Sequence, residues 1–203
     1  MSKKNIALLT IFVALFIDQA SKIYVKTHFE LGEEVIVFAN WFKIHFTENN
    51  GMAWGFEFGG KAGKLFLTLF RLIAVIGIIY WLRQHIKKGT HIAVIVAISL
   101  IFSGAVGNII DSVFYGRIFD TSNYKIATLF AENPYGEFLY GKVVDMLYFP
   151  IWKGVLPNWI PVMGGERFTF FNAIFNGADS YITIGVVLLF LFNKQAFLKE
   201  DSN

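Results

Sequence analysis

Long apolar segments constrain the fold of this chain more than any other feature of its sequence. Four stretches approach the length of about 20 residues that a helix needs to cross a bilayer, and they cover residues 6–25, 65–82, 92–110 and 175–192. Hydrophobic residues make up 55% of the chain and charged residues 16%, against about 25% charged in soluble domains. The sequence therefore predicts one membrane-embedded domain over residues 1–203, in the class of all-α polytopic membrane proteins.

Lysine and arginine residues set the predicted orientation, because basic residues concentrate in short cytoplasmic loops. With four transmembrane helices, three basic groups fall on one side: Lys3 and Lys4, then Arg83, Lys87 and Lys88, then Lys194 and Lys199. Both termini are predicted to be cytoplasmic, with outer loops at about 27–63 and 112–174. The first segment could instead be a signal peptide, but Asp18 interrupts the region of the cleavage site and favours a retained helix.

The outer loops have a composition of their own. Glu34–Phe38 and Trp41–Phe46 are aromatic and β-branched runs with partial alternation, which predict a small antiparallel β-sheet at the membrane surface. Residues 121–140 are polar and predict an inserted loop. Residues 147–171 are rich in aromatic residues and are predicted to lie along the membrane interface. These stretches are expected to form long, lid-like loops on the outer face.

Polar residues occur in these apolar segments at the ends that face the outer side. The pairs are Asp18 with Lys22, Asn108 with Asp111, and Asn176 with Asp179. Ionisable groups at membrane depth are costly and usually mark a functional site. Asp18 and Lys22 are also four residues apart, so a structural ion pair explains them as well. An N-terminal Asp such as Asp179 is often a helix cap.

Asp145 and Asp179 together indicate a specific chemistry. Two carboxylates in a dry site cannot both ionise easily, so one keeps a proton and the other acts as a base. The base deprotonates a water molecule and the acid polarises a peptide carbonyl, which is aspartyl-protease chemistry. It requires no cofactor. The chain has no cysteine, and its histidines show no HExxH spacing, so no metal site is predicted. Ser21 and Lys22 are adjacent on a helix and poorly placed as a catalytic pair.

Five short motifs in a fixed order resemble those of lipoprotein signal peptidase, the type II signal peptidase of bacterial inner membranes. They are Asp18-Gln-Ala-Ser-Lys22, Asn49-Asn-Gly-Met-Ala-Trp54, Gly107-Asn-Ile-Ile-Asp111, Gly141-Lys-Val-Val-Asp145 and Phe175-Asn-Gly-Ala-Asp179. The resemblance implies a multi-pass aspartic endopeptidase that cleaves prolipoproteins just before a diacylglyceryl-cysteine.

The resemblance also implies roles for particular residues. The catalytic pair falls on Asp145 and Asp179. The supporting or substrate-binding positions are Asp18, Lys22, Asn49, Gly51, Trp54, Asn108, Asp111 and Asn176. Expected partners are the prolipoprotein substrate, membrane lipid and globomycin-type inhibitors. The loop Glu48–Phe56, with Trp54 and Phe56, is expected to close over the substrate, and a monomer is the expected state for a site complete in one chain.

The chain departs from the family pattern at Ser112, where the family usually has Arg directly after the carboxylate. Arg117 or Arg71 could supply that charge. The stretches 121–140 and 147–171 also look longer than the usual connections. The main alternative function is a small membrane protein that binds or carries an ion or proton. The net charge of +3 is too small and dispersed to indicate nucleic-acid binding.

Overall fold

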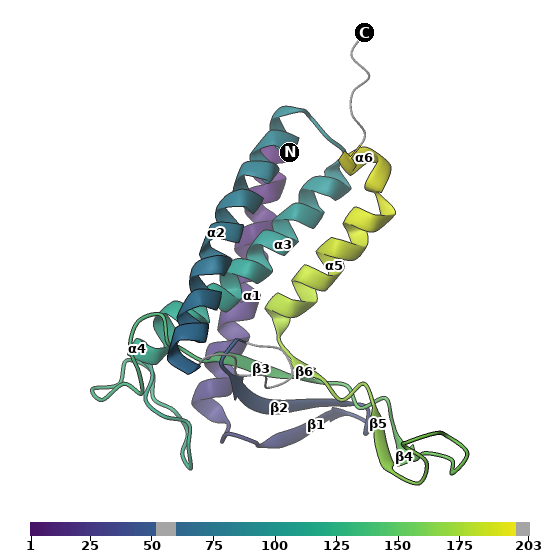
Figure 1. The fold of residues 1–203 in the computed structure, drawn as a ribbon. Coiled ribbons are helices and arrows are strands. Elements are labelled where there is room, and N and C mark those ends of the chain that lie inside the picture. Colours follow the sequence, from purple (N-terminus) through teal and green to yellow (C-terminus); the bar gives the residue numbers. More distant parts are fainter. Residues whose placement is uncertain (52–59, 198–203) are drawn as a thin grey trace.

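A bundle of apolar helices with a β-sheet at one end forms the fold of this computed structural model (Figure 1). The structure describes residues 1–51 and 60–197. The helices are α1 (Lys3–His28), α2 (Gly60–Lys87), α3 (Ile92–Ile110), α4 (Gly116–Ile118), α5 (Gly177–Leu191) and α6 (Asn193–Phe197), with a π-helical turn η2 (Asp111–Tyr115). The strands are β1 (Glu34–Phe38), β2 (Phe42–Asn49), β3 (Val143–Tyr148), β4 (Trp152–Val155), β5 (Arg167–Phe170) and β6 (Ile174–Phe175).

Three helical segments among the described residues are long and apolar enough to cross a membrane, namely Lys3–His28, Gly60–Lys87 and Ile92–Ile118. The predicted fourth span is represented by α5, which is apolar but has only 15 residues. It starts at Gly177 rather than at residue 175, because the Asn176 side chain accepts a hydrogen bond from the Asp179 amide and caps the helix. The two residues before the cap belong to β6 instead.

The basic residues of the three groups that the structure describes, at positions 3–4, 83–88 and 194, lie at the end of the bundle opposite the sheet. The N-terminus, the α2–α3 connection and α6 meet there (Figure 1). The Lys3 ammonium donates a hydrogen bond to the Gly89 carbonyl, and the His91 and Phe192 rings stack with centroids 5.2 Å apart. The polar residue pairs of the helices therefore lie toward the other end, where the sheet covers the bundle.

Small residues on α3 let α5 cross it at close range. A Cβ atom at Gly104 would overlap the Ala178 carbonyl oxygen, and it would lie 2.6 Å from Cγ1 of Ile182. A Cβ atom at Gly107 would overlap the Asp18 carboxylate. The partners at these glycines are thus the first turn of α5 and a side chain of α1, so both positions are needed to assemble the polar site.

Gly104→Ala is expected to lower the stability of the purified protein by about 1–3 kcal/mol, because the added methyl group meets backbone rather than a flexible side chain. Thermal unfolding in detergent measures the effect. The matched control is Gly77→Ala in α2, where an added Cβ finds nothing within 4 Å and helix propensity slightly favours alanine. Equal melting temperatures for the two variants would contradict the close α3–α5 packing.

The predicted hairpin forms and is then extended by strands from much later in the chain. β1 and β2 pair antiparallel, with Val35 opposite Ile44. β3 adds to β2 with Asn49 opposite Val143, and β6 adds to β3, which gives the order β1–β2–β3–β6. The sequence did not predict β3 or β6, and it treated residues 147–171 as an interfacial stretch without strands, although β4 and β5 form a separate hairpin there. These short strands carry little periodicity of their own and depend on partners distant in sequence.

The polar insert packs against the π-helical turn that follows α3. The amides of Leu139 and Gly141 donate hydrogen bonds to the carbonyls of Val113 and Ser112, at 3.1 and 2.8 Å. A π-helical turn disturbs the normal pattern of backbone hydrogen bonds, and the insert, together with the glycine that follows it, supplies donors for these carbonyls. Residues 121–140 are therefore part of the folded body at this point, and not only a lid beside it.

Candidate active site

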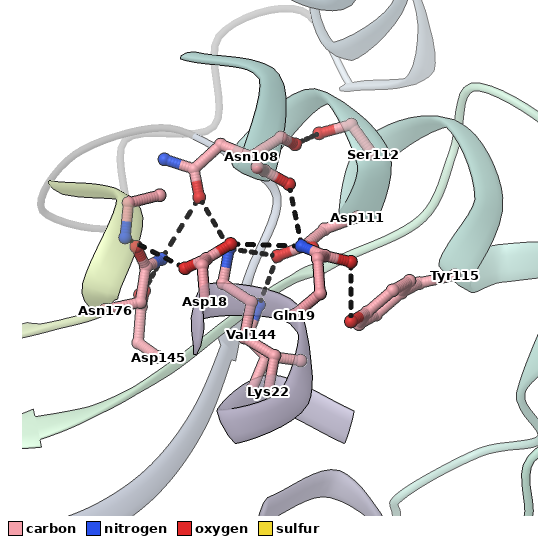
Figure 2. Close-up of polar contacts among 12 residues, drawn as sticks. Asp18, Gln19, Lys22, Asn108, Asp111, Ser112, Tyr115, Val144, Asp145 and Asn176 are labelled. Carbon is pink, nitrogen blue, oxygen red and sulfur yellow. Dashed lines mark hydrogen bonds and ion pairs between the residues drawn. The ribbon is translucent and has the colours of Figure 1, made fainter. Parts of the chain in front are cut away.

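The buried Lys22 ammonium is the centre of the polar site (Figure 2). It lies 3.0 Å from the Asp18 carboxylate and 2.8 Å from the Asp111 carboxylate, and it donates a 3.0 Å hydrogen bond to Asn108 Oδ1. Among the described residues, these three acceptors match the three N–H groups of the ammonium. The predicted Asp18–Lys22 pair is confirmed, and the pair also binds the end of α3.

Asp18 and Asp111 also accept hydrogen bonds from backbone amides of the elements around α1. Asp18 Oδ1 accepts a 2.8 Å hydrogen bond from the amide of Ala178 in the first turn of α5, where N–H groups lack partners within the helix. Asp111 Oδ2 accepts one from the amide of Val144 on β3, at 3.3 Å. One carboxylate thus fixes the start of α5 and the other fixes β3, and these are the elements that carry Asp179 and Asp145.

Asparagine side chains hold the two candidate catalytic carboxylates. The amide of Asn176 donates to Asp145 Oδ1 at 2.7 Å and to Asn108 Oδ1 at 3.1 Å. The Asn108 amide donates to Asp179 Oδ1 at 2.9 Å, and the Asn49 amide donates to Asp145 Oδ2. The predicted pair is therefore linked by Asn108 and Asn176, with Lys22 behind Asn108.

Burial and charge act on the two carboxylates differently. Burial, together with the charge of Asp179, raises the pKa of Asp145 to about 7, although hydrogen bonds from Asn49 and Asn176 oppose the shift. Asp179 is only half-buried and lies in the first turn of α5, where the helix dipole favours a negative charge. The arrangement therefore favours a proton on Asp145.

The raised pKa predicts how Asp145→Asn affects folding stability. Asp145 binds its proton more tightly in the folded state than in the unfolded state, so the folded protein loses stability as pH rises from about 4 to about 7. Asn resembles the protonated acid. The variant's gain in melting temperature over the wild type should therefore be small at pH 5 and clearly larger at pH 8. Asp120→Asn is the control. Lys125 and the Thr128 amide lower the pKa of Asp120, so its carboxylate is charged at both pH values and its small contribution to folding stability does not change between them. A larger gain for Asp145→Asn at pH 5 than at pH 8 would contradict this.

An apolar groove of about 350 Å³ opens beside Asp179. Phe171, Phe175, Ser180, Thr183 and Ile184 line it together with Asp179. Asp179, Ser180, Thr183 and Ile184 all lie on α5, so the groove runs along one side of that helix.

The predicted arginine substitutes for the residue missing at Ser112 have different positions. Arg71 Nη2 donates a 2.6 Å hydrogen bond to the Gly51 carbonyl, and its guanidinium interacts electrostatically with Asp179. Arg117 is exposed on α4 and makes no polar contact with the described part of the chain. Ser112 is buried and donates to the Asn108 carbonyl of its own helix. Arg71, and not Arg117, therefore reaches the site.

Two other predictions concern residues near the site. Trp54 and Phe56, expected in a closing loop, lie outside the described residues. The Ser21 hydroxyl donates to the Asp18 carbonyl at 2.8 Å and is not paired with Lys22. Within residues 1–51 and 60–197, no group of three or more His, Asp or Glu side chains is arranged to hold a metal ion.

Sequence reasoning missed Gln19 as a site residue. Its amide donates to Asp18, to the Gly107 carbonyl and to Asp111, at 3.0, 3.2 and 3.0 Å, and its oxygen accepts from the Tyr115 hydroxyl. Figure 2 shows it beside both carboxylates. Its place as a polar residue inside an apolar segment was the available signal.

A second buried cluster was also missed. Lys26 forms an ion pair with Glu48 and donates a 2.7 Å hydrogen bond to Ser122 of the polar insert. Burial alone would raise the pKa of Glu48, but the charges of Lys26 and Lys142 outweigh it and hold that pKa below its usual range. Glu48 directly precedes Asn49 on β2, so this cluster ties the insert to the strand that contacts Asp145.

Comparison with known proteins places this architecture in a family. The family model "Signal peptidase (SPase) II" matches residues 10–193. A lipoprotein signal peptidase of Porphyromonas gingivalis is 50% identical over 181 residues, which cover 88% of this chain and 78% of that protein. One from Staphylococcus aureus is 31% identical over 197 residues, with 97% and 89% covered.

Solved structures agree with these relatives. A bacterial membrane enzyme determined by the in meso method at 1.9 Å resolution is 27% identical to this chain, with a TM-score of 0.62 and coverage of 97% of this chain and 94% of that chain. Another, at 2.3 Å resolution, gives a TM-score of 0.59. The chain belongs to the signal peptidase II family of bacterial membrane proteases, whose members remove signal peptides from prolipoproteins.

Proposed function

We propose that this protein cleaves diacylglyceryl-modified prolipoproteins just before the lipid-modified cysteine, with Asp145 and Asp179 as a catalytic dyad. The observation that carries the proposal is the pair of carboxylates held by Asn49, Asn108 and Asn176 beside an apolar groove. The enzyme works in the bacterial inner membrane as a monomer, with both termini cytoplasmic and the site near the outer face. Globomycin-type inhibitors bind at the same site.

The mechanism follows from the different environments of the two carboxylates. Asp179 takes a proton from a water molecule, and the resulting hydroxide adds to the scissile carbonyl carbon while Asp145 gives its proton to the carbonyl oxygen. Asp179 then protonates the leaving amine and Asp145 recovers a proton from the diol as the C–N bond breaks. The raised pKa of Asp145 supports its role as the initial acid. Asn108 and Asn176 keep the carboxylates in place during both proton transfers.

The substrate's lipid chains stay in the bilayer along α5, and its peptide enters the groove at Phe171 and Phe175. The apolar lining excludes water from the carbonyl apart from the molecule that reacts. Lys22 is not a proton donor in this scheme. It stabilises Asp18, Asp111 and Asn108, and through Asn108 the position of Asp179.

Arg71 supplies the positive charge expected after Asp111 in this family. Its hydrogen bond to the Gly51 carbonyl and its electrostatic interaction with Asp179 support this role. Arg71→Lys keeps the charge but loses the forked guanidinium, so its kcat/KM for cleavage should fall about tenfold, mainly because KM rises. Arg71→Ala loses the charge as well, so its kcat/KM should fall further. Steady-state cleavage and inhibitor affinity measure both effects. Arg117→Ala is the control and should behave as wild type; normal cleavage by Arg71→Ala would remove Arg71 from the site.

The test of the function uses purified protein and a prolipoprotein prepared with and without the diacylglyceryl group. A gel-shift assay should show cleavage of the lipidated substrate only, and mass spectrometry should place the new N-terminus at the modified cysteine. Equal cleavage of both substrates would contradict lipid recognition. Cleavage of neither by a monodisperse protein would contradict the proposed activity and favour ion or proton binding.

A further inference from the structure

The β4–β5 hairpin exposes apolar side chains from its base to its tip. The main ones are Ile151, Trp152, Val155, Trp159, Val162 and Phe170. Trp159 is 80% exposed and Val162 is 101% exposed, so neither packs against the described part of this chain. The two strands pair with each other and form a sheet separate from β1–β2–β3–β6. The hairpin is therefore not held in place by a hydrophobic core of its own.

The position of the hairpin indicates which environment surrounds these exposed side chains. In Figure 1 it extends sideways from the sheet end of the bundle, beyond α5 and away from the other helices. The start of α5 lies at that same end, next to β6. In a membrane-embedded chain, a hairpin that projects past the outermost helix at this level lies over lipid and not over protein. The nearest apolar partner is thus the surface of the bilayer.

The backbone of the hairpin tip is suited to a partly dehydrated environment. The Leu156 and Gly165 amides donate to the Glu166 and Leu156 carbonyls at 3.0 and 2.9 Å, and the Gly164 amide donates to the Ile160 carbonyl at 3.0 Å. Pro157 and Pro161 have no amide hydrogen to satisfy. Since unpaired backbone groups are the main cost of entering lipid, internal pairing lowers the cost of inserting this tip.

The charges beside the tip fit a phospholipid headgroup layer. Lys153 and Arg167 are exposed on the two strands, with one exposed acidic residue, Glu166, next to Arg167, so basic charge exceeds acidic charge there. Lys153 Nζ lies 5.5 Å from the centre of the Tyr148 ring. Tryptophan and tyrosine rings favour the boundary between headgroups and acyl chains, and basic side chains there attract anionic lipids. We propose that residues 151–170 insert into the outer leaflet interface as a membrane anchor, with Trp159 and Val162 at acyl-chain depth.

The anchor also has a consequence for the groove beside Asp179. Phe171 directly follows β5 and lines that groove. A hairpin held in the leaflet therefore keeps one wall of the groove at the lipid surface, where a lipid-linked substrate arrives. This consequence rests on the proposed function, whereas the insertion of the hairpin does not depend on any chemistry at Asp179.

The test exploits the absence of native cysteine. Trp159→Cys and Val162→Cys would each carry a nitroxide label in nanodiscs of phosphatidylethanolamine and phosphatidylglycerol. The control is Glu132→Cys, an exposed position in the polar insert. Electron paramagnetic resonance would compare collisions with oxygen, which concentrates in lipid, and with a water-soluble nickel chelate.

Labels at 159 and 162 should favour oxygen over the chelate several-fold more than the label at 132 does. Agreement between the labels at 159 and 162 shows that the result does not come from a local effect of one substitution. Monodisperse elution shows that each variant is folded. Chelate accessibility equal to that of the control would overturn the anchor. Protection from both reagents would also overturn it, because it would show that a protein surface, such as a second copy of the chain, covers the hairpin. Cleavage activity does not enter this measurement, so its outcome is independent of the catalytic assignment.

Discussion

Asp179→Asn is expected to lower the cleavage rate by about four orders of magnitude, the size of loss that removal of one member of a catalytic group causes in other hydrolases. Asn keeps the shape of the side chain, and Asn176 still caps α5 through its own side chain. The variant should therefore fold and bind substrate but lack a base for the attacking water. Gel-shift cleavage of a lipidated prolipoprotein by wild type and variant measures the loss.

Asp145→Asn should be impaired to a similar degree, because Asn cannot give a proton to the carbonyl oxygen and later recover it. The double variant should be hardly slower than either single one, since the two carboxylates act as a unit. Glu132→Gln, an exposed change in the polar insert, is the control for handling and expression. Near wild-type cleavage by either single variant would disprove the dyad.

Lys22→Met should destabilise the protein by about 3–5 kcal/mol, as expected when one partner of a buried ion pair is removed. Lys22, Asp18 and Asp111 are all 0% exposed, and the change would leave two facing carboxylates without their cation. Methionine retains most of the volume, so the effect is electrostatic rather than a cavity effect. Chemical or thermal unfolding in detergent gives the difference in stability.

Two further variants isolate this electrostatic origin. Adding Asp111→Asn to Lys22→Met removes one of the uncompensated charges and should restore part of the lost stability. Lys125→Met breaks the exposed pair with Asp120, whose atoms are 2.6 Å apart, and should cost at most about 1 kcal/mol. Equal losses for Lys22→Met and Lys125→Met would show that the buried cluster contributes no more than a surface pair.

The elements that could be predicted from sequence are those with a strong local signal. Continuous apolar runs predicted helices where α1, α2 and α3 lie, and alternation in residues 34–46 predicted β1 and β2. The spacing of Asp18 and Lys22 predicted their ion pair. The predicted start of the last helix was wrong by two residues because the Asn176 cap was not recognised as its boundary.

The elements that were missed depend on contacts between distant segments. β3 pairs with β2 from a distant part of the chain, with Val143 opposite Asn49, and residues 143–148 alone resemble any short apolar run. Glu48 and Ser122 are unremarkable surface residues in the sequence, yet both meet Lys26 in a buried cluster. No periodicity links positions so far apart, since their partnership exists only after the chain folds.

The sequence by itself determined that the chain is built for a membrane, that its polar residues lie at one end of apolar segments, and which motifs it shares with a family. Those properties follow from composition and local spacing, which act without knowledge of the fold. Only the tertiary structure decided that Lys22 joins Asp18, Asp111 and Asn108, that Asn176 links Asp145 to Asn108, and that Arg71 rather than Arg117 reaches the site. A buried charge needs all its partners at once, and the packing of α1, α3, α5 and β3 determines which side chains supply them.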